Sequence, residues 1–383
     1  MKNLVLVIVI LSLSFHCGPK QDEVEKTIED GVEVVINHFE PYKVKGEPSD
    51  LVLEEEFTID TEKDEIGELG LTDIWGIDVD SEENIYLLHL QSRENCIFKF
   101  NKEGNFISSF GRRGQGPGEM QYPIFFQVIN NEIAVTDPTK VVFFSNNGKF
   151  LEEISKDANM LSVIFLKNGN YLVRERIRDP SDSATQHIGL RLYDTEFNEI
   201  KEIDRGPGYH FKGDGYRAIL PYIHACVLGE KIFEGNSERE YEIHAYDLNG
   251  NLIKKIKKEY NPVPINEQDK ERILKLFERM SEEIKKTIYF PDNFPPFQRL
   301  FFTDDEGRLF VMTYEKGEKP RQFIYDIFDS DGVFIGRIGL DNYGQDAMQM
   351  APLPALSKDG LLYSVREKES GYKELVVYRM NWE

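Results

Sequence analysis

Short apolar runs separated by polar turns fill most of this chain, and six of the runs close on an aromatic residue. These residues are Phe100, Phe144, Tyr193, Tyr246, Phe328 and Tyr378, with spacings of 44, 49, 53, 82 and 50 positions by subtraction. A polar hairpin turn follows five of the six. A period near this length, made of short strands, is typical of a β-propeller with one four-stranded blade per repeat. The pattern therefore predicts an all-β fold, a six-bladed β-propeller with four-stranded blades.

The expected strands can be placed blade by blade. Blade one takes residues 74–79, 85–90, 97–100 and 106–110, and blades two to five take 124–154, 161–203, 223–256 and 300–338. Glu-Gly and Asn-Gly pairs stand in the turns, where glycine reaches positive φ without strain. The wide spacing of 82 comes from an insertion at 261–296 between blades four and five.

The insertion has the pattern of a helix. Its apolar residues recur three or four positions apart, which places them on one helical face: Ile273, Phe277, Met280, Ile284 and Ile288. Asn266 and Asp269 form a capping pair at its start. We expect a helix over 266–287, serving either as a lid over the channel mouth or as a packed structural insertion.

Blade six lacks a fourth strand at the C-terminus. Residues 355–357, 361–366 and 375–380 supply three strands, and an unassigned strand over 51–59 precedes blade one. We predict that this N-terminal strand completes blade six and closes the ring, because an open edge between first and last blades would invite aggregation.

The N-terminus has the features of an export signal. Lys2 precedes an apolar core of about ten residues, too short to span a bilayer. The core runs into Cys17, in the manner of a lipobox, although His16 stands where a small residue is usual. We expect a signal peptide over 1–16, a lipid on Cys17, an acidic tether over 17–49 that ends in a strand or packed segment near 32–36, and the propeller over 50–383. Conventional cleavage nearby and an uncleaved anchor remain alternatives.

The amino-acid composition limits the classes of partner and cofactor that the protein could bind. With 68 acidic against 46 basic residues, the formal charge is -22, which argues against nucleic acid because phosphate binding needs a basic face. Cys96 and Cys226 fall in blades one and four, too far apart for a disulfide. No metal-ligand or redox spacing occurs, so no cofactor is expected.

One segment carries a sharper signature. Residues 97–120 end in the Gly-rich loop Gly111-Arg-Arg-Gly-Gln-Gly-Pro-Gly118, and Pro123 follows. This segment resembles an NHL-type repeat, and the whole layout resembles the six-bladed β-propeller lipoproteins of bacterial envelopes. The resemblance implies a fold and a location at the periplasm or outer membrane, with a soluble periplasmic or secreted protein as the alternative. It implies binding only loosely.

Long connections are expected on one face of the ring. The second turn of each blade and the link to the next blade share a face, and here they form eight long segments, which we take as the binding face. Candidate binding residues on it are Arg112, Arg113, Gln115, His187, Arg205, His210, His224, Arg239 and Arg299. The Gly-rich loop could cradle an anion with its backbone, or could be a turn whose glycines satisfy geometry. The other cations form either a cationic spot or scattered solvated charges.

The partner class is then a protein, peptide or glycan, bound by a non-catalytic module. The alternative is a metal-assisted hydrolase or lyase with its site in the axial channel, where His224 and Arg299 would take part. Such a site needs clustered oxygen ligands. The innermost strands offer Asp73, Ser162, His224 and Arg299, with one carboxylate among them. No catalytic residue is assigned.

Overall fold

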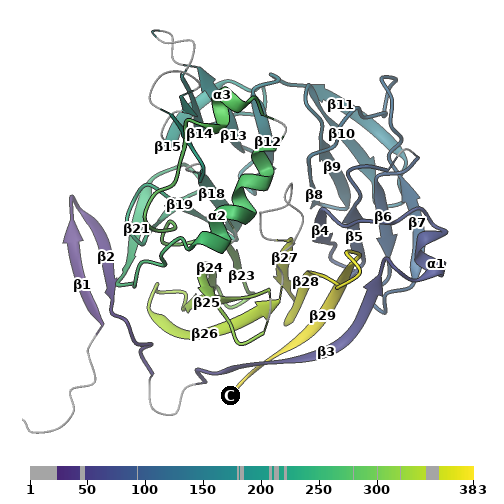
Figure 1. Ribbon diagram of the computed structural model, residues 1–383. Coiled ribbons are helices and arrows are strands. Elements are labelled where there is room, and N and C mark those ends of the chain that lie inside the picture. Colours follow the sequence, from purple (N-terminus) through teal and green to yellow (C-terminus); the bar gives the residue numbers. More distant parts are fainter. Residues whose placement is uncertain are drawn as a thin grey trace, which may run out of the picture.

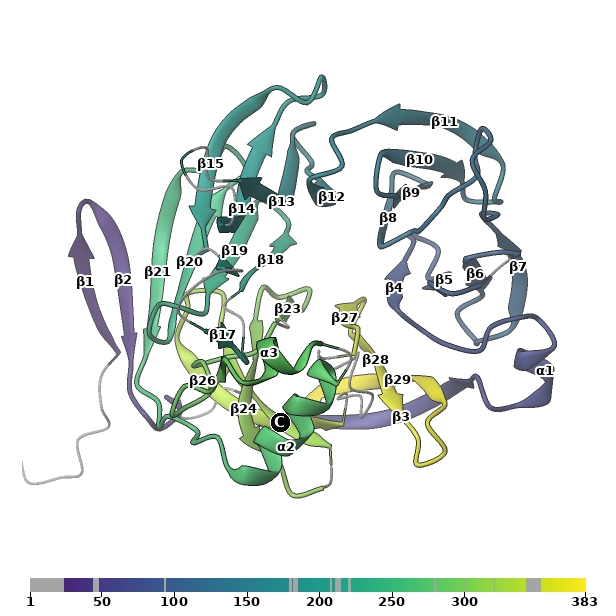
Figure 2. The same ribbon diagram turned by 45° about the horizontal axis from the view of Figure 1, so that its top comes forward.

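A computed structural model of the chain describes residues 24–43, 48–92, 94–178, 181, 185–206, 209–210, 215–219, 222–278, 280–299, 301–319, 321–341 and 353–383. These residues form a ring of six blades, each built on a four-stranded antiparallel sheet (Figures 1 and 2). The predicted fold class is confirmed. The leader, Cys17 and the first part of the expected tether, up to residue 23, lie outside the described residues, as do residues 44–47.

Each blade runs from an inner strand to an outer one. Blade one holds β4 (Gly76–Val79), β5 (Ile85–Leu88), β6 (Ile97–Phe100) and β7 (Phe106–Phe110). Blade two holds β8 (Phe125–Ile129), β9 (Glu132–Thr136), β10 (Lys140–Ser145) and β11 (Phe150–Ser155). Blade three holds β12 (Met160–Phe165), β13 (Tyr171–Arg178), β14 (Thr185–Tyr193) and β15 (Glu199–Arg205), with the short β16 (Tyr209–His210) added to β14.

The other three blades follow the same order. Blade four holds β18 (Ile223–Leu228), β19 (Lys231–Asn236), β20 (Glu242–Asp247) and β21 (Leu252–Lys258). Blade five holds β23 (Phe301–Thr303), β24 (Leu309–Lys316), β25 (Gln322–Phe328) and β26 (Phe334–Asp341). Blade six holds β27 (Ala355–Lys358), β28 (Leu361–Glu367), β29 (Lys373–Trp382) and β3 (Leu51–Asp60).

The six aromatic residues of the repeat occupy one equivalent place. Each lies in the third strand of its blade, and at each the pairing with the outer strand shifts register. In blade one, for example, the shift falls between Lys99 and Phe100. A register shift of this kind is a β-bulge, which bends the strand and increases its twist. The sequence period thus marks the point where each outer strand turns away from the sheet.

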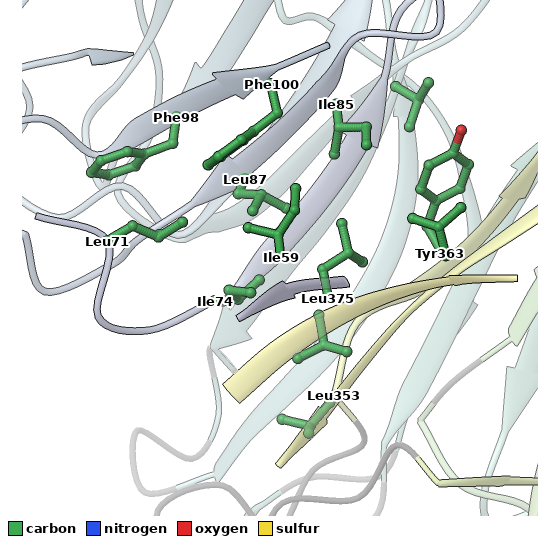
Figure 3. Close-up of a cluster of buried hydrophobic side chains, with 13 residues drawn as sticks. Ile59, Leu71, Ile74, Ile85, Leu87, Phe98, Phe100, Leu353, Tyr363 and Leu375 are labelled. Atoms are coloured by element: carbon green, nitrogen blue, oxygen red, sulfur yellow. The ribbon is translucent and has the colours of Figure 1, made fainter. Parts of the chain in front are cut away.

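The hydrophobic core is divided among the blade interfaces. Six clusters of buried side chains fill the six junctions between neighbouring blades. Figure 3 shows the cluster between blades six and one, where Ile59 of β3 and Leu375 of β29 meet Ile85, Leu87 and Phe98 of blade one. The two faces of each blade are therefore both buried, which explains the nearly continuous apolar runs of the central strands.

The ring closes as the sequence predicted. Strand β3 pairs antiparallel with β29 along most of its length, from Asp60 opposite Glu374 to Leu51 opposite Trp382. Figure 1 shows β3 running beside β29 at the edge of blade six. The backbone of Glu383 also bonds to Ser49 and Asp50. The N-terminal and C-terminal strands of the propeller thus share one sheet.

The segment before β3 is folded onto the ring. Strands β1 (Glu25–Glu29) and β2 (Val32–Asn37) form a hairpin, and β2 pairs in parallel with the outer strand β21 of blade four. The strand expected near 32–36 is β2, and its residues Val34 and Val35 are fully buried. Glu29 holds Lys255 and Lys257 at 3.1 and 2.7 Å. The acidic residues of this stretch thus complement the lysines of β21.

The insertion is helical but broken. Helix α2 (Glu267–Leu274) begins at Asn266, whose side chain accepts a hydrogen bond from the backbone of Asp269 as expected. A 3-10 turn over Lys275–Phe277 and a separate helix α3 (Glu282–Lys285) replace the single helix expected over 266–287. Ile288 belongs to β22 (Ile288–Tyr289), which pairs with β17 (Tyr216–Arg217) in the link after blade three. This pairing ends the helical pattern, because the chain must turn to reach β17.

The insertion packs on that link rather than standing free. Ile273 and Phe277 contact Ala218, Tyr216 and Ile219, and the rings of Tyr216 and Phe277 meet edge to face. Figures 1 and 2 show α2 and α3 lying in front of the strands of the ring. A fourth short helix, α1 (Asp64–Gly67), lies between β3 and β4. None of the helices in the described ranges is long and apolar enough to cross a membrane.

The two cysteines outside the leader are separate free thiols. Cys96 is buried next to β6 and Cys226 is half-buried on β18. Burial raises the pKa of each thiol to about 12, which keeps them protonated and unreactive. The expectation that no disulfide joins them is confirmed.

Candidate functional site

One face of the ring is closed by short turns with a repeated internal structure. In six of these turns the first side chain accepts hydrogen bonds from the backbone N–H groups two and four residues later: Asp80, Asn101, Asp194, Asp247, Asp304 and Asp329. Such side chains mimic the backbone and fix the turn. We call this the short-turn face. Its polar side chains have structural tasks.

The same side of the ring ties the blades together. The lysines Lys99, Lys201, Lys254 and Lys358 each donate to a backbone carbonyl of the neighbouring blade, at 2.7 to 3.1 Å. Gln127 of β8 bonds to the backbone of Phe165 in blade three, and the amide of Gly360 in blade six donates to Asp305 of blade five. All six junctions therefore carry a side-chain tie. Each charge-assisted tie is worth about 1.5–3 kcal/mol.

The opposite face carries the second turns and the links between blades, and we call it the loop-rich face. Five large apolar side chains are exposed there: Tyr122, Ile124, Leu274, Tyr289 and Tyr372. The remaining exposed large apolar side chains of the described residues lie on outer strands or on the N-terminal segment, and none lies in a short turn. Exposed tyrosines and arginines are the side chains enriched at protein interfaces.

The Gly-rich loop does not present an open anion cradle. The amide of Gly116 donates to the Glu119 carboxylate at 3.0 Å, and the amide of Gly118 donates to Glu153 at 3.3 Å. Two carboxylates of the chain itself therefore occupy the place that an anion would take. Gly118 has φ +72°, and a Cβ there would lie 2.8 Å from the Phe150 ring. This favours the interpretation of the loop as a turn whose glycines satisfy geometry.

The candidate residues of this loop differ in whether their side chains already form contacts within the chain. Arg113 donates to the carbonyl of Leu90 and lies over the Tyr122 ring at 5.9 Å, so it serves to hold the loop. Arg112 and Gln115 are exposed. Only these two are available to a partner without breaking a contact that is seen in the described residues.

Most candidate binding residues of blades three and four already form hydrogen bonds or ion pairs within the chain. His187 bonds to the carbonyl of Gly206 at 3.1 Å, and Arg205 pairs with Glu202 at 2.7 Å. His210 belongs to β16, but its side chain lies outside the described part of the chain. His187 and Arg205 are therefore held by contacts within the chain.

Arg239 belongs to a buried network between blades three and four. Its guanidinium bonds to Glu234 at 2.7 Å and also to Asp204. Glu234 is 0 % exposed, and burial raises its pKa to about 8 against the opposing pull of Arg239. His244 lies in the same network, 3.8 Å from Glu234. The arginine is therefore an internal counter-ion and not a free cation.

His224 and Arg299 do come together at the axial channel. His224 lies on the inner strand β18, and its ring meets Phe301 edge to face at 5.2 Å. The residue is half-buried, and desolvation lowers the pKa of its imidazole to about 3, with Arg174 and Arg299 adding to the effect. Arg299 is exposed and lies 5.0 Å from the centre of the Tyr222 ring. The mouth of the channel thus combines a neutral imidazole with arginines.

The carboxylates of the inner strands are held by the chain. Asp73 accepts the indole N–H of Trp75 at 2.7 Å and pairs with Lys373 at 2.6 Å. Asp78 on β4, which the sequence reasoning missed, accepts the amide of Val128 at 2.6 Å, and burial raises its pKa to about 6. Its position between Ile77 and Val79 on an inner strand was the available signal. Asp78 thus ties β4 to β8 in the next blade.

A metal-assisted site needs several oxygen or nitrogen ligands around one point. Among the residues that the structure describes, no group of three or more His, Cys, Asp or Glu is placed to hold a metal ion. His224 and Arg299 offer one neutral imidazole and one cation, which is not a ligand set. Nothing in this geometry favours the hydrolase or lyase alternative.

The comparisons with known proteins agree with the fold. Residues 71–208 match a family described as 6-bladed beta-propeller, DUF5128. A search of curated proteins finds no match to this chain. The match covers blades one to three and so supports the fold for that part of the chain.

Among solved structures, a candidate exported protein from Bacteroides fragilis NCTC 9343 is 16 % identical, with 91 % of this chain and 99 % of that chain covered and a TM-score of 0.51. A gluconolactonase from Xanthomonas campestris is 11 % identical, with 87 % and 96 % covered and a TM-score of 0.44. A protein of unknown function from Bacteroides caccae is 12 % identical, with 71 % and 83 % covered and a TM-score of 0.37. At these identities the first likeness shows the fold alone, and the other two carry no argument.

Proposed function

We propose that the protein is a non-catalytic binding or scaffold module of the bacterial envelope, which recognises a protein, peptide or glycan through its loop-rich face. The observation that carries this proposal is the contrast between the two faces. Three exposed tyrosines, Tyr122, Tyr289 and Tyr372, lie on the loop-rich face together with the exposed Arg112 and Arg299. On the short-turn face, by contrast, the polar side chains named above form hydrogen bonds within their own turns or to the neighbouring blade.

The charge of the protein limits the partner. A formal charge of -22 repels nucleic acid and other polyanions at long range. Exposed aromatic side chains suit contacts in which water is excluded from a small apolar centre with a polar rim. A protein, peptide or glycan surface meets both conditions.

The proposed location rests on the sequence of the N-terminus. The apolar core and Cys17 support export and lipid attachment at that cysteine, at the periplasm or outer membrane. The likeness to a candidate exported protein is in keeping with export. We expect Cys17→Ala to move the protein from the membrane fraction to the soluble fraction, as followed by immunoblot after cell fractionation. An unchanged membrane fraction would exclude the lipid anchor.

The binding face is tested by capture from solubilised envelopes. The full-length protein is used as bait, beside a variant with Tyr289→Ser and Tyr372→Ser. The control carries Ile107→Ser and Ile200→Ser on outer strands, and Ile107, Ile200 and Tyr289 are all 49 % exposed. Quantitative mass spectrometry should show partners that are retained by the wild type and the control but lost with the tyrosine variant. Partners lost equally in both variants, or in neither, would contradict a binding role for this face.

A further inference from the structure

His224 differs from the other histidines whose side chains the structure describes. The others each bond to a carboxylate or a backbone carbonyl of the chain: His38, His89, His187 and His244. Within the ranges that the structure covers, neither ring nitrogen of His224 takes part in a hydrogen bond or an ion pair. A half-buried imidazole without a partner is unfavourable unless water or a ligand supplies one. The ring nitrogens of His224 are therefore available to a ligand.

Aromatic packing holds the imidazole of His224 in place. Its ring lies edge to face on Phe301 at 5.2 Å, and Phe301 packs in the same way on Phe297 at 5.3 Å. Gly235 is paired with His224 across the sheet, and a Cβ there would lie 2.5 Å from the Phe301 ring. The glycine thus makes room for the ring that supports the imidazole. A side chain fixed in this way loses little conformational entropy when it binds.

Arg299 supplies a guanidinium beside this imidazole. The Cζ atom of Arg299 lies 5.0 Å from the centre of the Tyr222 ring, and Tyr222 stands two positions before His224. Tyr222 and Phe301 belong to the same buried cluster between blades four and five. The inner strands β18 and β23, where these residues lie or which they immediately precede, border the middle of the ring (Figure 2). Among the described residues, no carboxylate pairs with Arg299.

The surroundings of the imidazole are positively charged. Arg174 of blade three and Arg299 both lower the pKa of His224, so both guanidinium groups lie close enough to act on it. With a pKa of about 3, the imidazole is neutral at pH 7 and carries one N–H donor. The channel mouth thus offers positive charge and a neutral donor, although the whole chain has a formal charge of -22.

A carboxylate group matches these features. One of its oxygens can accept from the guanidinium of Arg299, and the other can accept from the N–H of His224. A polyanion fits poorly, because its further charges would meet the negative field of the acidic protein. A single carboxylate brings no such charges.

We propose that the mouth of the axial channel binds a single carboxylate group, held between Arg299 and His224 beside the rings of Tyr222 and Phe301. Such a group stands at the C-terminus of a peptide and in a uronic acid residue of a glycan. This inference rests on the proposed function, since it names the chemical group that the loop-rich face recognises.

The test is saturation-transfer NMR of the full-length protein with two matched pairs of ligands. One pair is N-acetyl-dialanine with a free or an amidated C-terminus, and the other is glucuronate and glucose. We expect the charged member of at least one pair to bind with a dissociation constant of about 1 mM or lower. Its neutral counterpart should bind about tenfold more weakly or worse, because it lacks the charge-assisted bonds. The pair that responds tells a peptide end from a uronic acid.

Two variants and a control connect this binding to the channel mouth. Arg299→Gln and His224→Phe should each weaken it about tenfold or more. Arg299 is exposed, and a phenylalanine ring can pack on Phe301 as the imidazole does, so both variants are expected to fold. The control Lys149→Gln removes one positive charge from an exposed short turn on the opposite face, and should bind as the wild type does.

Three results would overturn the proposal: no binding of either charged ligand at about 10 mM, equal binding of the charged and neutral members of both pairs, or unchanged binding in either variant. The proposed function can fail separately. If envelope partners depend on Tyr289 and Tyr372 but no carboxylate binds, the loop-rich face binds a partner and the carboxylate site is wrong. If a carboxylate binds at the channel mouth but no partner depends on the tyrosines, the carboxylate site stands and the argument from the exposed tyrosines is wrong.

Discussion

Gly148 is a residue at which one methyl group would disturb a blade junction. Its φ is +81°, and a Cβ there would lie 2.6 Å from the Phe110 ring of blade one. Gly169 stands in a similar turn with φ +90° and nothing within 4 Å of its Cβ position. Gly169→Ala should cost the backbone strain of about 1–2 kcal/mol. Gly148→Ala should cost about 1–3 kcal/mol more, through overpacking.

Chemical denaturation of the two glycine variants checks this. Equal losses in the free energy of unfolding would show that the Phe110 ring moves aside freely. That outcome would contradict a tightly packed junction between blades one and two.

His224 is a second single residue with a testable effect, because it should make the free energy of unfolding depend on pH. Its pKa is about 3 in the folded protein and about 6.5 in an unfolded chain. Between these values the unfolded chain binds one more proton, so the free energy of unfolding falls as the pH falls through this window. From pH 7 to pH 5 the loss from this residue should be about 1–2 kcal/mol, since the residue is only half-buried.

His224→Gln should lose less stability over that pH range than the wild type does. Melting temperatures at pH 7 and pH 5 for both proteins supply the measurement. Parallel pH profiles would mean that the imidazole is as easily protonated in the folded protein as in water.

Individual site residues were hard to predict because their partners lie far away in the sequence. Arg239 was a candidate cation, yet it is neutralised by Asp204 of the neighbouring blade. The amide of Gly118 was a candidate anion donor, yet Glu153 of the next blade already accepts from it. The exposure of Tyr289 and Tyr372 depends on how loops pack, and no local pattern encodes it. His224 and Arg299 were predicted near the channel mouth because both flank inner strands.

The elements themselves followed from local patterns. Each aromatic residue of the repeat lies at the same bulge in the third strand of its blade. The spacing of these residues along the chain was therefore enough to predict the number and order of the blades. The prediction of a single helix over 266–287 was wrong because β22 pairs with β17. The spacing of apolar residues along the chain carries no information about this pairing. The hairpin of β1 and β2 was only partly foreseen, since its pairing with β21 joins segments more than 200 positions apart.

Two truncations separate the roles of the N-terminal elements. A chain that begins at residue 38 loses the hairpin and with it the buried side chains of Val34 and Val35. A chain that begins at residue 61 also loses β3, so β29 is left unpaired and Ile59 leaves the core between blades six and one. Burial of each such side chain is worth about 1.5–3 kcal/mol. We expect a drop of a few degrees in melting temperature for the first and a several-fold larger drop for the second.

Differential scanning calorimetry of both truncated chains is the measurement. Similar melting temperatures for the two would argue that β3 does not hold the ring closed. The same conclusion would follow if the first truncation lowered the melting temperature by more than the further loss of β3 does.

At the scale of the whole molecule, the ring is a set of six similar junctions, each with its own apolar cluster and its own side-chain tie. No single junction dominates, so the fold was predictable from a repeat without knowledge of any particular contact. The function was not predictable in the same way, because the two faces differ in loops and exposed side chains that the repeat does not specify.

The pairing of β3 with β29 has a consequence for how the protein is made. About 310 residues separate Asp60 from Lys373, and a ribosome adds roughly 5–20 residues per second. The nascent β3 therefore waits on the order of tens of seconds for its partner, with an unpaired edge that other chains can join. A holding chaperone that covers this strand during synthesis would prevent such misassembly.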